Sequence, residues 1–63
     1  MGFKFRLNAS VVDEVTGFSG IITARTEYAT TAPNRYLVEN LDRTARPVEW
    51  WFDEDRLVPD YGE

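Results

Sequence analysis

The feature that most limits how this chain can fold is that its 63 residues include neither cysteine nor histidine. A chain of this length buries only about 60% of the surface that its unfolded form exposes, so its stability is marginal. Disulfides are excluded, and without the common sulfur and nitrogen ligands a structural zinc site is excluded too. Packing remains, and the sequence supplies four phenylalanines, three tyrosines and two tryptophans for it. We therefore expect one domain over residues 1–63 with an aromatic core.

The pattern of apolar residues favours strands over helices. Residues 18–28 are rich in β-branched and aromatic types, and the even-numbered positions from Phe18 to Tyr28 make the more apolar face. The acidic triplet at 53–55 predicts a tight turn or one turn of 3-10 helix. Other strands are expected at 10–15, 35–40, 47–52 and 56–58, with 3–7 as an additional candidate. This order favours an all-β fold, a small five-stranded SH3-like barrel with a 3-10 turn before the last strand.

Two glycines flank Phe18 at the start of the longest predicted strand. We expect Gly17 to serve the turn that precedes this strand, and Gly20 to allow a bend, a bulge or a close backbone approach. Phe18 between them would fill the barrel. A simple β-hairpin turn explains the same residues equally well. A phosphate-binding loop is excluded, because the segment lacks the required spacing, a lysine and a following helix.

Charge is distributed unevenly along the chain. Residues 1–48 carry six bases and five acids, whereas residues 49–63 carry one base and six acids, which gives the net charge of −4. An acidic chain is a poor partner for phosphate backbones, because such binding depends on lysine and arginine displacing counterions. No stretch reaches the ~20 apolar residues of a spanning helix, and no signal peptide is evident. The sequence therefore predicts a soluble, cytoplasmic protein.

Several short motifs carry a resemblance to a known group of proteins. They are Val15-Thr16-Gly17-Phe18 with Gly20, then Thr23-Ala24-Arg25, then Trp51-Phe52-Asp53-Glu54. Over Val11 to Leu57 the chain resembles small uncharacterised proteins of tailed phages and prophages and, more loosely, KOW-type SH3-like barrels. The segment 29–34 departs from the glycine-containing turn of that pattern. The resemblance implies a phage or prophage context, in an infected or lysogenic host cell or in the virion, and it transfers no catalytic residue.

An enzyme is not expected, because the usual catalytic groups are missing. The chain has no histidine or cysteine, its one lysine is Lys4, and Ser10 and Ser19 have no imidazole to activate them. The carboxylates at 53–55 could bind Mg²⁺ or Ca²⁺, but consecutive side chains point in different directions, which favours a solvated turn. We therefore predict no cofactor and no metal site.

Adjacent tryptophans offer the best candidate binding surface. Neighbouring residues on a strand face opposite sides. If Val48 and Phe52 point into the core, Trp50 is buried with them and Trp51 is exposed. Alternatively, the C-terminal segment 58–63 covers Trp51. Exposed tryptophan with tyrosine and arginine is typical of a protein-binding hot spot. The predicted binding residues are Trp51, Arg25, Tyr28 and Arg35, with Tyr36 either joining them or lying in the core.

Three functions are consistent with these features. The first is a phage or prophage accessory protein that binds a host or virion protein through its aromatic and arginine side chains, with self-association as an option. The second is a counter-defence inhibitor whose acidic C-terminal part mimics nucleic acid. The third is a small barrel that binds nucleic acid by stacking, which the net charge disfavours. Fold class alone does not select among them.

Overall fold

The computed structural model describes residues 2–41 and 44–60 of the chain. They form one antiparallel sheet of five strands in the order β4-β3-β2-β1-β5. The elements in chain order are β1 (Ser10–Asp13), β2 (Ser19–Thr26), β3 (Arg35–Leu41), β4 (Pro47–Asp53), the 3-10 helix η1 (Glu54–Arg56) and β5 (Leu57–Pro59). This confirms the predicted all-β, five-stranded SH3-like class with a 3-10 turn before the last strand.

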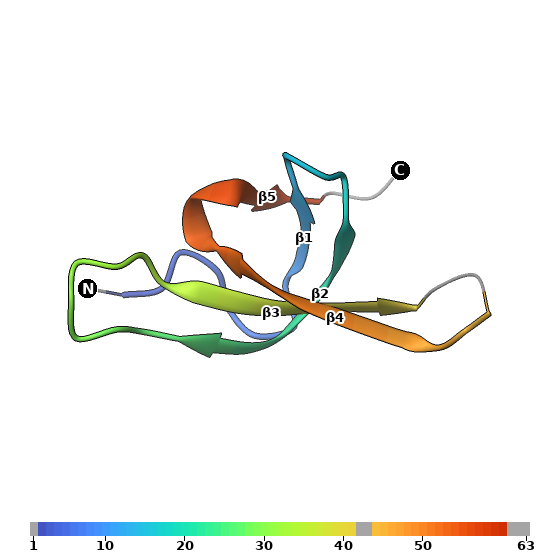
Figure 1. The fold of residues 1–63 in the computed structure, drawn as a ribbon, viewed down its shortest axis with the longest axis horizontal. Helices are drawn as coiled ribbons and strands as arrows, with labels where there is room; N and C mark the ends of the chain where they lie inside the picture. The colour runs from blue at the N-terminus through green and yellow to red at the C-terminus, as the bar shows by residue number, and fades with distance from the viewer. Residues whose placement is uncertain (1, 42–43, 61–63) are drawn as a thin grey trace.

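The sheet is strongly bent rather than flat. Strands β3 and β4 run along the long axis of the molecule, β1 and β5 lie together across one side of them, and β2 begins beside β1 and then bends to run along β3 (Figure 1). The principal extents are 38 × 23 × 20 Å, so the long strands reach beyond the part that β1 and β5 cover. Within residues 2–41 and 44–60, no helix is long and apolar enough to span a membrane.

The core lies on the concave side of this bent sheet. It consists of seven buried side chains from all five strands and the N-terminal segment: Phe5, Val11, Ile22, Tyr36, Val38, Phe52 and Leu57. The candidate strand at 3–7 is wrong, because this segment pairs with no strand and instead packs its aromatic rings on Tyr36. Phe5 meets the Tyr36 ring edge-on, with 5.4 Å between ring centroids. Aromatic packing therefore replaces strand pairing at this end of the sheet.

A bulge in β2 changes which side chains reach the core. Ile22 pairs with Val38, but Ala24 pairs with Leu37, so the register shifts by one residue between Ile22 and Ala24. Since side chains alternate along a strand, the extra residue moves every later side chain to the opposite face. The predicted single apolar face over 18–28 is therefore wrong beyond the bulge, where Ala24 turns away from the core.

Gly17 and Gly20 have different structural roles. Gly17 lies in the hairpin connection between β1 and β2 with φ +82°, a conformation that glycine adopts without strain. A Cβ on Gly20 would lie 2.2 Å from the backbone oxygen of Glu39, so β2 and β3 approach closely there. Phe18 between them is half-buried and stacks on Phe52 with 5.6 Å between ring centroids. The turn at Gly17 and the close approach at Gly20 are confirmed, while the bulge itself lies further along β2.

Gly20→Ala should destabilise the protein by at least about 2 kcal/mol, because the added methyl group would have to push two backbones apart. Gly2→Ala is the matched control, since no atom lies within 4 Å of its added Cβ. Urea unfolding followed by circular dichroism measures both variants. Equal midpoints for the two variants would contradict the close packing of β2 against β3.

Candidate functional site

The two tryptophans of β4 are exposed on opposite faces of the sheet. Trp50 pairs with Val38 on the face that carries the core, and Trp51 pairs with Leu37 on the outer face, which is turned away from the core. The exposed fraction is 67% for Trp50 and 44% for Trp51. Strand β4 therefore presents one accessible tryptophan on each face of the sheet.

The expected burial of Trp50 is wrong, although the predicted side of the strand is right. Phe18 covers Phe52 by stacking on it, but Trp50 lies further along β4, beyond the part of the sheet that Phe18 covers. A hollow of about 630 Å³ opens beside it, and we call this the Trp50 hollow. Its lining residues are Thr16, Gly17, Phe18, Val48, Trp50, Phe52 and Arg56.

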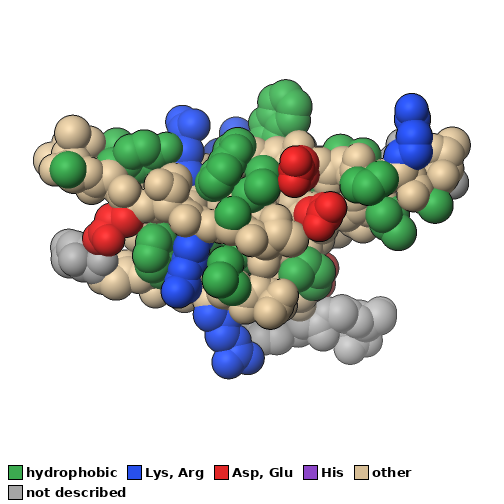
Figure 2. Space-filling view, turned by 90° about the horizontal axis from the view of Figure 1, so that it is seen from below, with side chains coloured by type: hydrophobic (Ala, Val, Ile, Leu, Met, Phe, Trp, Pro, Cys, Tyr) green, Lys and Arg blue, Asp and Glu red, His purple; other side chains and the backbone are tan. Residues whose placement is uncertain are grey.

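The outer face brings together three of the four predicted binding residues. Tyr28, Arg35 and Trp51 line a shallow depression of about 300 Å³ together with Thr26. Leu37 lies directly opposite Trp51 on the neighbouring strand. Figure 2 shows the side of the molecule turned away from β1 and β5, where hydrophobic side chains lie along the whole length between acidic and basic ones. We refer to Thr26, Tyr28, Arg35, Leu37 and Trp51 as the Trp51 surface.

Arg25 does not join the Trp51 surface. The bulge in β2 places it opposite Tyr36, on the other face of the sheet. Its guanidinium donates a hydrogen bond of 2.9 Å to the backbone oxygen of Phe5 and lies 4.4 Å from the ring centroid of Phe3. Arg25 therefore fastens the N-terminal segment to the sheet, and Tyr36 lies in the core. Of the candidate cover 58–63, residues 58–60 bond to β1, and residues 61–63 lie outside the described part of the chain.

The charges around the Trp51 surface are partly paired. Arg35 donates a hydrogen bond of 2.9 Å to Asp53, and because both side chains are well exposed this ion pair contributes little to stability. Glu39 and Glu49 lie directly opposite each other across β3 and β4. Within the described residues, neither carboxylate has a hydrogen bond or an ion pair, and like charges in this position repel. The sheet thus holds two uncompensated negative charges beside Trp51.

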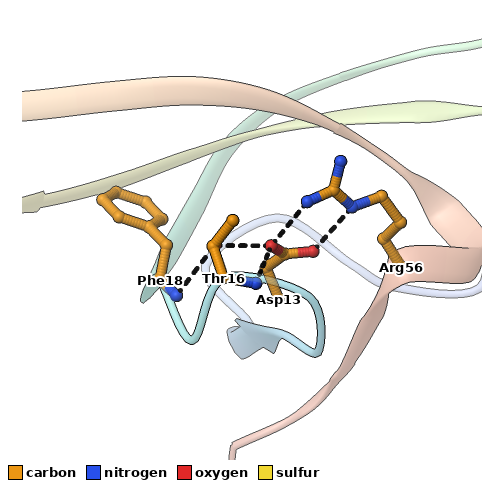
Figure 3. Close-up of polar contacts among 4 residues, drawn as sticks. All are labelled: Asp13, Thr16, Phe18 and Arg56. Atoms are coloured by element: carbon orange, nitrogen blue, oxygen red, sulfur yellow. Dashed lines mark hydrogen bonds and ion pairs between the residues drawn. The ribbon is translucent and has the colours of Figure 1, made fainter.

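Asp13, which was not predicted as a functional residue, holds Thr16 and Arg56 in place at the border of the Trp50 hollow. Its side chain is fully buried and accepts hydrogen bonds from Arg56 at both carboxylate oxygens, at 2.9 and 2.8 Å (Figure 3). Thr16 donates to the same carboxylate through its backbone N–H and its hydroxyl, at 2.9 and 2.6 Å. The Thr16 hydroxyl oxygen in turn accepts from the backbone N–H of Phe18. One carboxylate therefore fixes both the turn and the 3-10 helix that border the hollow.

These hydrogen bonds keep Asp13 ionised in spite of its burial. The hydrogen bonds from Arg56 hold the pKa of the Asp13 carboxyl far below its usual value, and those from Thr16 act in the same direction against the effect of burial. The pKa of Arg56 is raised, first of all by its hydrogen bonds to Asp13. Both carboxylate oxygens of Asp13 thus accept hydrogen bonds, which is the condition for a stable buried charge.

The acidic segment at 53–55 is used for internal contacts. Glu54 accepts hydrogen bonds from the hydroxyl of Tyr36 and from the backbone N–H of Lys4. Burial would raise the pKa of Glu54, but the hydrogen bonds from Tyr36, Lys4 and Asn34 outweigh it and the pKa is lowered. The pKa of Tyr36 is raised by burial and by its bond to Glu54. Among the described residues, no cluster of three or more potential ligands could hold a metal ion.

Comparison with known protein families, with curated proteins and with solved structures returned no match for this chain. The functional interpretation therefore depends on the residues and their geometry.

Asp13→Asn should lower the free energy of unfolding at pH 7 by about 1.5–3 kcal/mol, because it removes the charge-assisted hydrogen bonds that the buried carboxylate accepts from Arg56. A folded-state pKa below the unfolded value stabilises the protein above the unfolded pKa, and this stabilisation is lost as pH falls below about 4. The variant should therefore lose less stability than wild type on acidification, as measured by urea unfolding between neutral and acid pH. Asp55→Asn removes an exposed acid of η1 as a control. A parallel pH dependence in wild type and Asp13→Asn would contradict this assignment.

Proposed function

We propose that this chain is a non-enzymatic protein-binding module that binds its partner through the Trp51 surface. The observation that carries the proposal is an exposed tryptophan of β4 flanked by Arg35 of the paired strand β3 and by Tyr28 of the β2–β3 connection. Tryptophan, tyrosine and arginine are the side chains most enriched in interface hot spots. Because β3 and β4 pair along their whole lengths, Trp51 and Arg35 are held in place before a partner arrives, which reduces the entropy lost on binding.

The charges around this surface indicate the chemistry of the partner. Glu39 and Glu49 repel each other, and a cationic side chain placed between them would relieve that repulsion. The ring of Trp51 and the side chain of Leu37 offer an apolar contact directly beside them. The best-matched partner is a protein surface that presents an apolar side chain next to a lysine or an arginine.

The two alternative functions receive less support from the same residues. Nucleic-acid binding needs free cations near the aromatic rings, but Arg35 is paired with Asp53 and two carboxylates lie nearby. Mimicry of nucleic acid needs acids gathered on one face. Glu54 instead accepts a hydrogen bond from Tyr36, and Asp53 accepts one from Arg35. A protein partner therefore remains the better proposal.

The identity of the partner is a further part of the proposal. The resemblance to small phage and prophage proteins supports a partner from the host or from the virion. In that setting the module acts in the cytoplasm of an infected or lysogenic cell, or as part of the particle.

Trp51→Ala should abolish the capture of a protein partner while the domain stays folded. Tagged wild type and variant are compared by affinity capture from host and phage lysates, after circular dichroism has shown equal secondary structure. Leu7→Ala is the matched control, because Leu7 is exposed to a similar extent (46%) but lies in the N-terminal segment. Salt-sensitive recovery of nucleic acid, or equal capture by wild type and Trp51→Ala, would contradict the proposal.

Glu49→Gln should separate binding from stability. Removing one of two opposed carboxylates should stabilise the domain by about 0.2–1 kcal/mol, because it ends a cross-strand repulsion. The same change should weaken binding to the captured partner and reduce the dependence of the affinity on salt concentration. Glu14→Gln removes an exposed acid of the β1–β2 connection and should change neither property. Tighter binding by Glu49→Gln would rule out a cationic partner residue at this position.

A further inference from the structure

Strand β4 forms an open edge of the sheet. It lies at the end of the strand order, so within the described residues its backbone is paired on one side only, with β3. The strand is seven residues long and contains no lysine, and its proline is the first residue, where it blocks little. Proteins usually protect edges of this kind with charges, bulges or very short strands. Because β4 has no bulge, is not short, carries only Glu49 and Asp53 as charges and has two exposed tryptophans, its edge is suited to pairing with another strand.

We propose that β4 pairs with β4 of a second copy of this chain, antiparallel and in the register that places Trp50 opposite Trp50. The two sheets then continue into each other across a two-fold axis that passes beside Trp50. This inference does not depend on the proposed protein-binding function, since it is argued from the open backbone edge and the charge pattern of β4.

Geometry limits the possible registers to a small number. In an antiparallel pair, residues that lie opposite each other point to the same side of the sheet. Two identical strands related by a two-fold axis therefore place either a residue opposite itself or residues an even number of positions apart. The registers that pair at least five residues of β4 are centred on Glu49, on Trp50 or on Trp51.

Charge selects the register centred on Trp50. The register centred on Glu49 places that carboxylate opposite its own copy, and the register centred on Trp51 places Glu49 opposite Asp53 twice. Like charges directly opposite each other destabilise strand pairing. The register centred on Trp50 opposes no two charges of the same sign, and it also pairs all seven residues. The strand is thus complementary to itself in one register, which is the observation that identifies a second copy as the occupant.

The same register covers the apolar side chains that the monomer leaves exposed. On the core face, Trp50 packs against Trp50 of the second copy, and Val48 packs against Phe52 of the second copy. These three side chains all line the Trp50 hollow, so the second copy extends the apolar wall of the hollow. Pairing therefore removes apolar surface from water in addition to satisfying the backbone of the edge.

On the outer face, the pairing places Glu49 opposite Trp51 of the second copy. The two Trp51 side chains then lie diagonally across the two-fold axis, within reach of each other, and the two Glu49 side chains occupy the other diagonal. The dimer would present both Trp51 surfaces on one side of a continuous sheet. Since the two Glu49 carboxylates repel at this distance, dimerisation should strengthen when salt is added.

Analytical ultracentrifugation of wild type from about 10 μM to 1 mM tests the proposal, because a single strand pair gives a small, concentration-dependent interface. Wild type should shift from monomer to dimer over this range. Trp50→Glu should remain monomeric, since it places two like charges opposite each other at the axis. Val15→Glu is the matched control, because it adds a charge at an exposed apolar side chain of the β1–β2 connection and should dimerise as wild type does. A wild type that stays monomeric, or a Trp50→Glu variant that dimerises normally, overturns the proposal.

Cysteine cross-linking tests the register, since the natural chain contains no cysteine to interfere. A mixture of Glu49→Cys and Trp51→Cys chains should form the mixed disulfide on mild oxidation, because these positions face each other across the axis. Both variants keep Trp50 at the centre of the interface. Trp50→Cys alone should also cross-link to itself, whereas Glu49→Cys alone should not. Preferential self-cross-linking of Glu49→Cys, or a mixed pair that fails to react, would overturn the register.

Discussion

The ion pair between buried Asp13 and partly exposed Arg56 is the interaction on which most of this structure depends. Asp13 ends β1, and Arg56 ends the 3-10 helix that leads into β5. Their hydrogen bonds hold the β1–β2 turn against η1, and Thr16 extends the same network to the backbone of Phe18. A domain of this length is stable by only a few kcal/mol, and charge-assisted hydrogen bonds to a buried carboxylate contribute about 1.5–3 kcal/mol. The fold therefore depends on a polar network as much as on its aromatic core.

The surface features follow from how far this core reaches along the sheet. Phe18, held in place through Thr16, covers Phe52 but does not extend to Trp50. Strand β4 is longer than the part of the sheet that the core covers. The part that carries Trp50 and Trp51 is therefore exposed, with one tryptophan on each face. The bulge in β2 turns Ala24 to the outer face and Arg25 to the other, and this leaves the Trp51 surface with Arg35 as its nearby base. Exposure of aromatic residues is thus a result of strand length relative to the core.

The sequence was sufficient to predict the class of fold because alternation and turn residues are local signals. Every expected strand from 10–15 onward is present, with ends within two residues, and Gly17 adopts the expected positive φ. Trp51 and Arg35 share the outer face, as alternation with Phe52 and Tyr36 in the core implies, whereas Tyr28 lies beside them only because the bulge in β2 reverses the faces of the later residues. Arg25 was misplaced because a bulge depends on how two strands pair, and pairing is not visible in one strand's own residues. Trp50 was misplaced because its burial depends on which side chains from other elements cover that face of the sheet.

Asp13 was missed because its partner Arg56 is distant in sequence, although an acid between a valine pair and a Thr-Gly turn was a signal worth following.

The exposure of both tryptophans can be measured directly by acrylamide quenching of fluorescence in Trp50→Phe and Trp51→Phe, each of which retains one tryptophan. At protein concentrations low enough to keep the chain monomeric, both variants should emit at the long wavelengths typical of solvent-exposed indole. Both should be quenched readily, and the ring of Trp50 more than that of Trp51, in line with exposed fractions of 67% and 44%. A short-wavelength, protected emission from Trp50 would mean that the core reaches further along β4 than described, and it would contradict the arrangement from which both proposed interfaces follow.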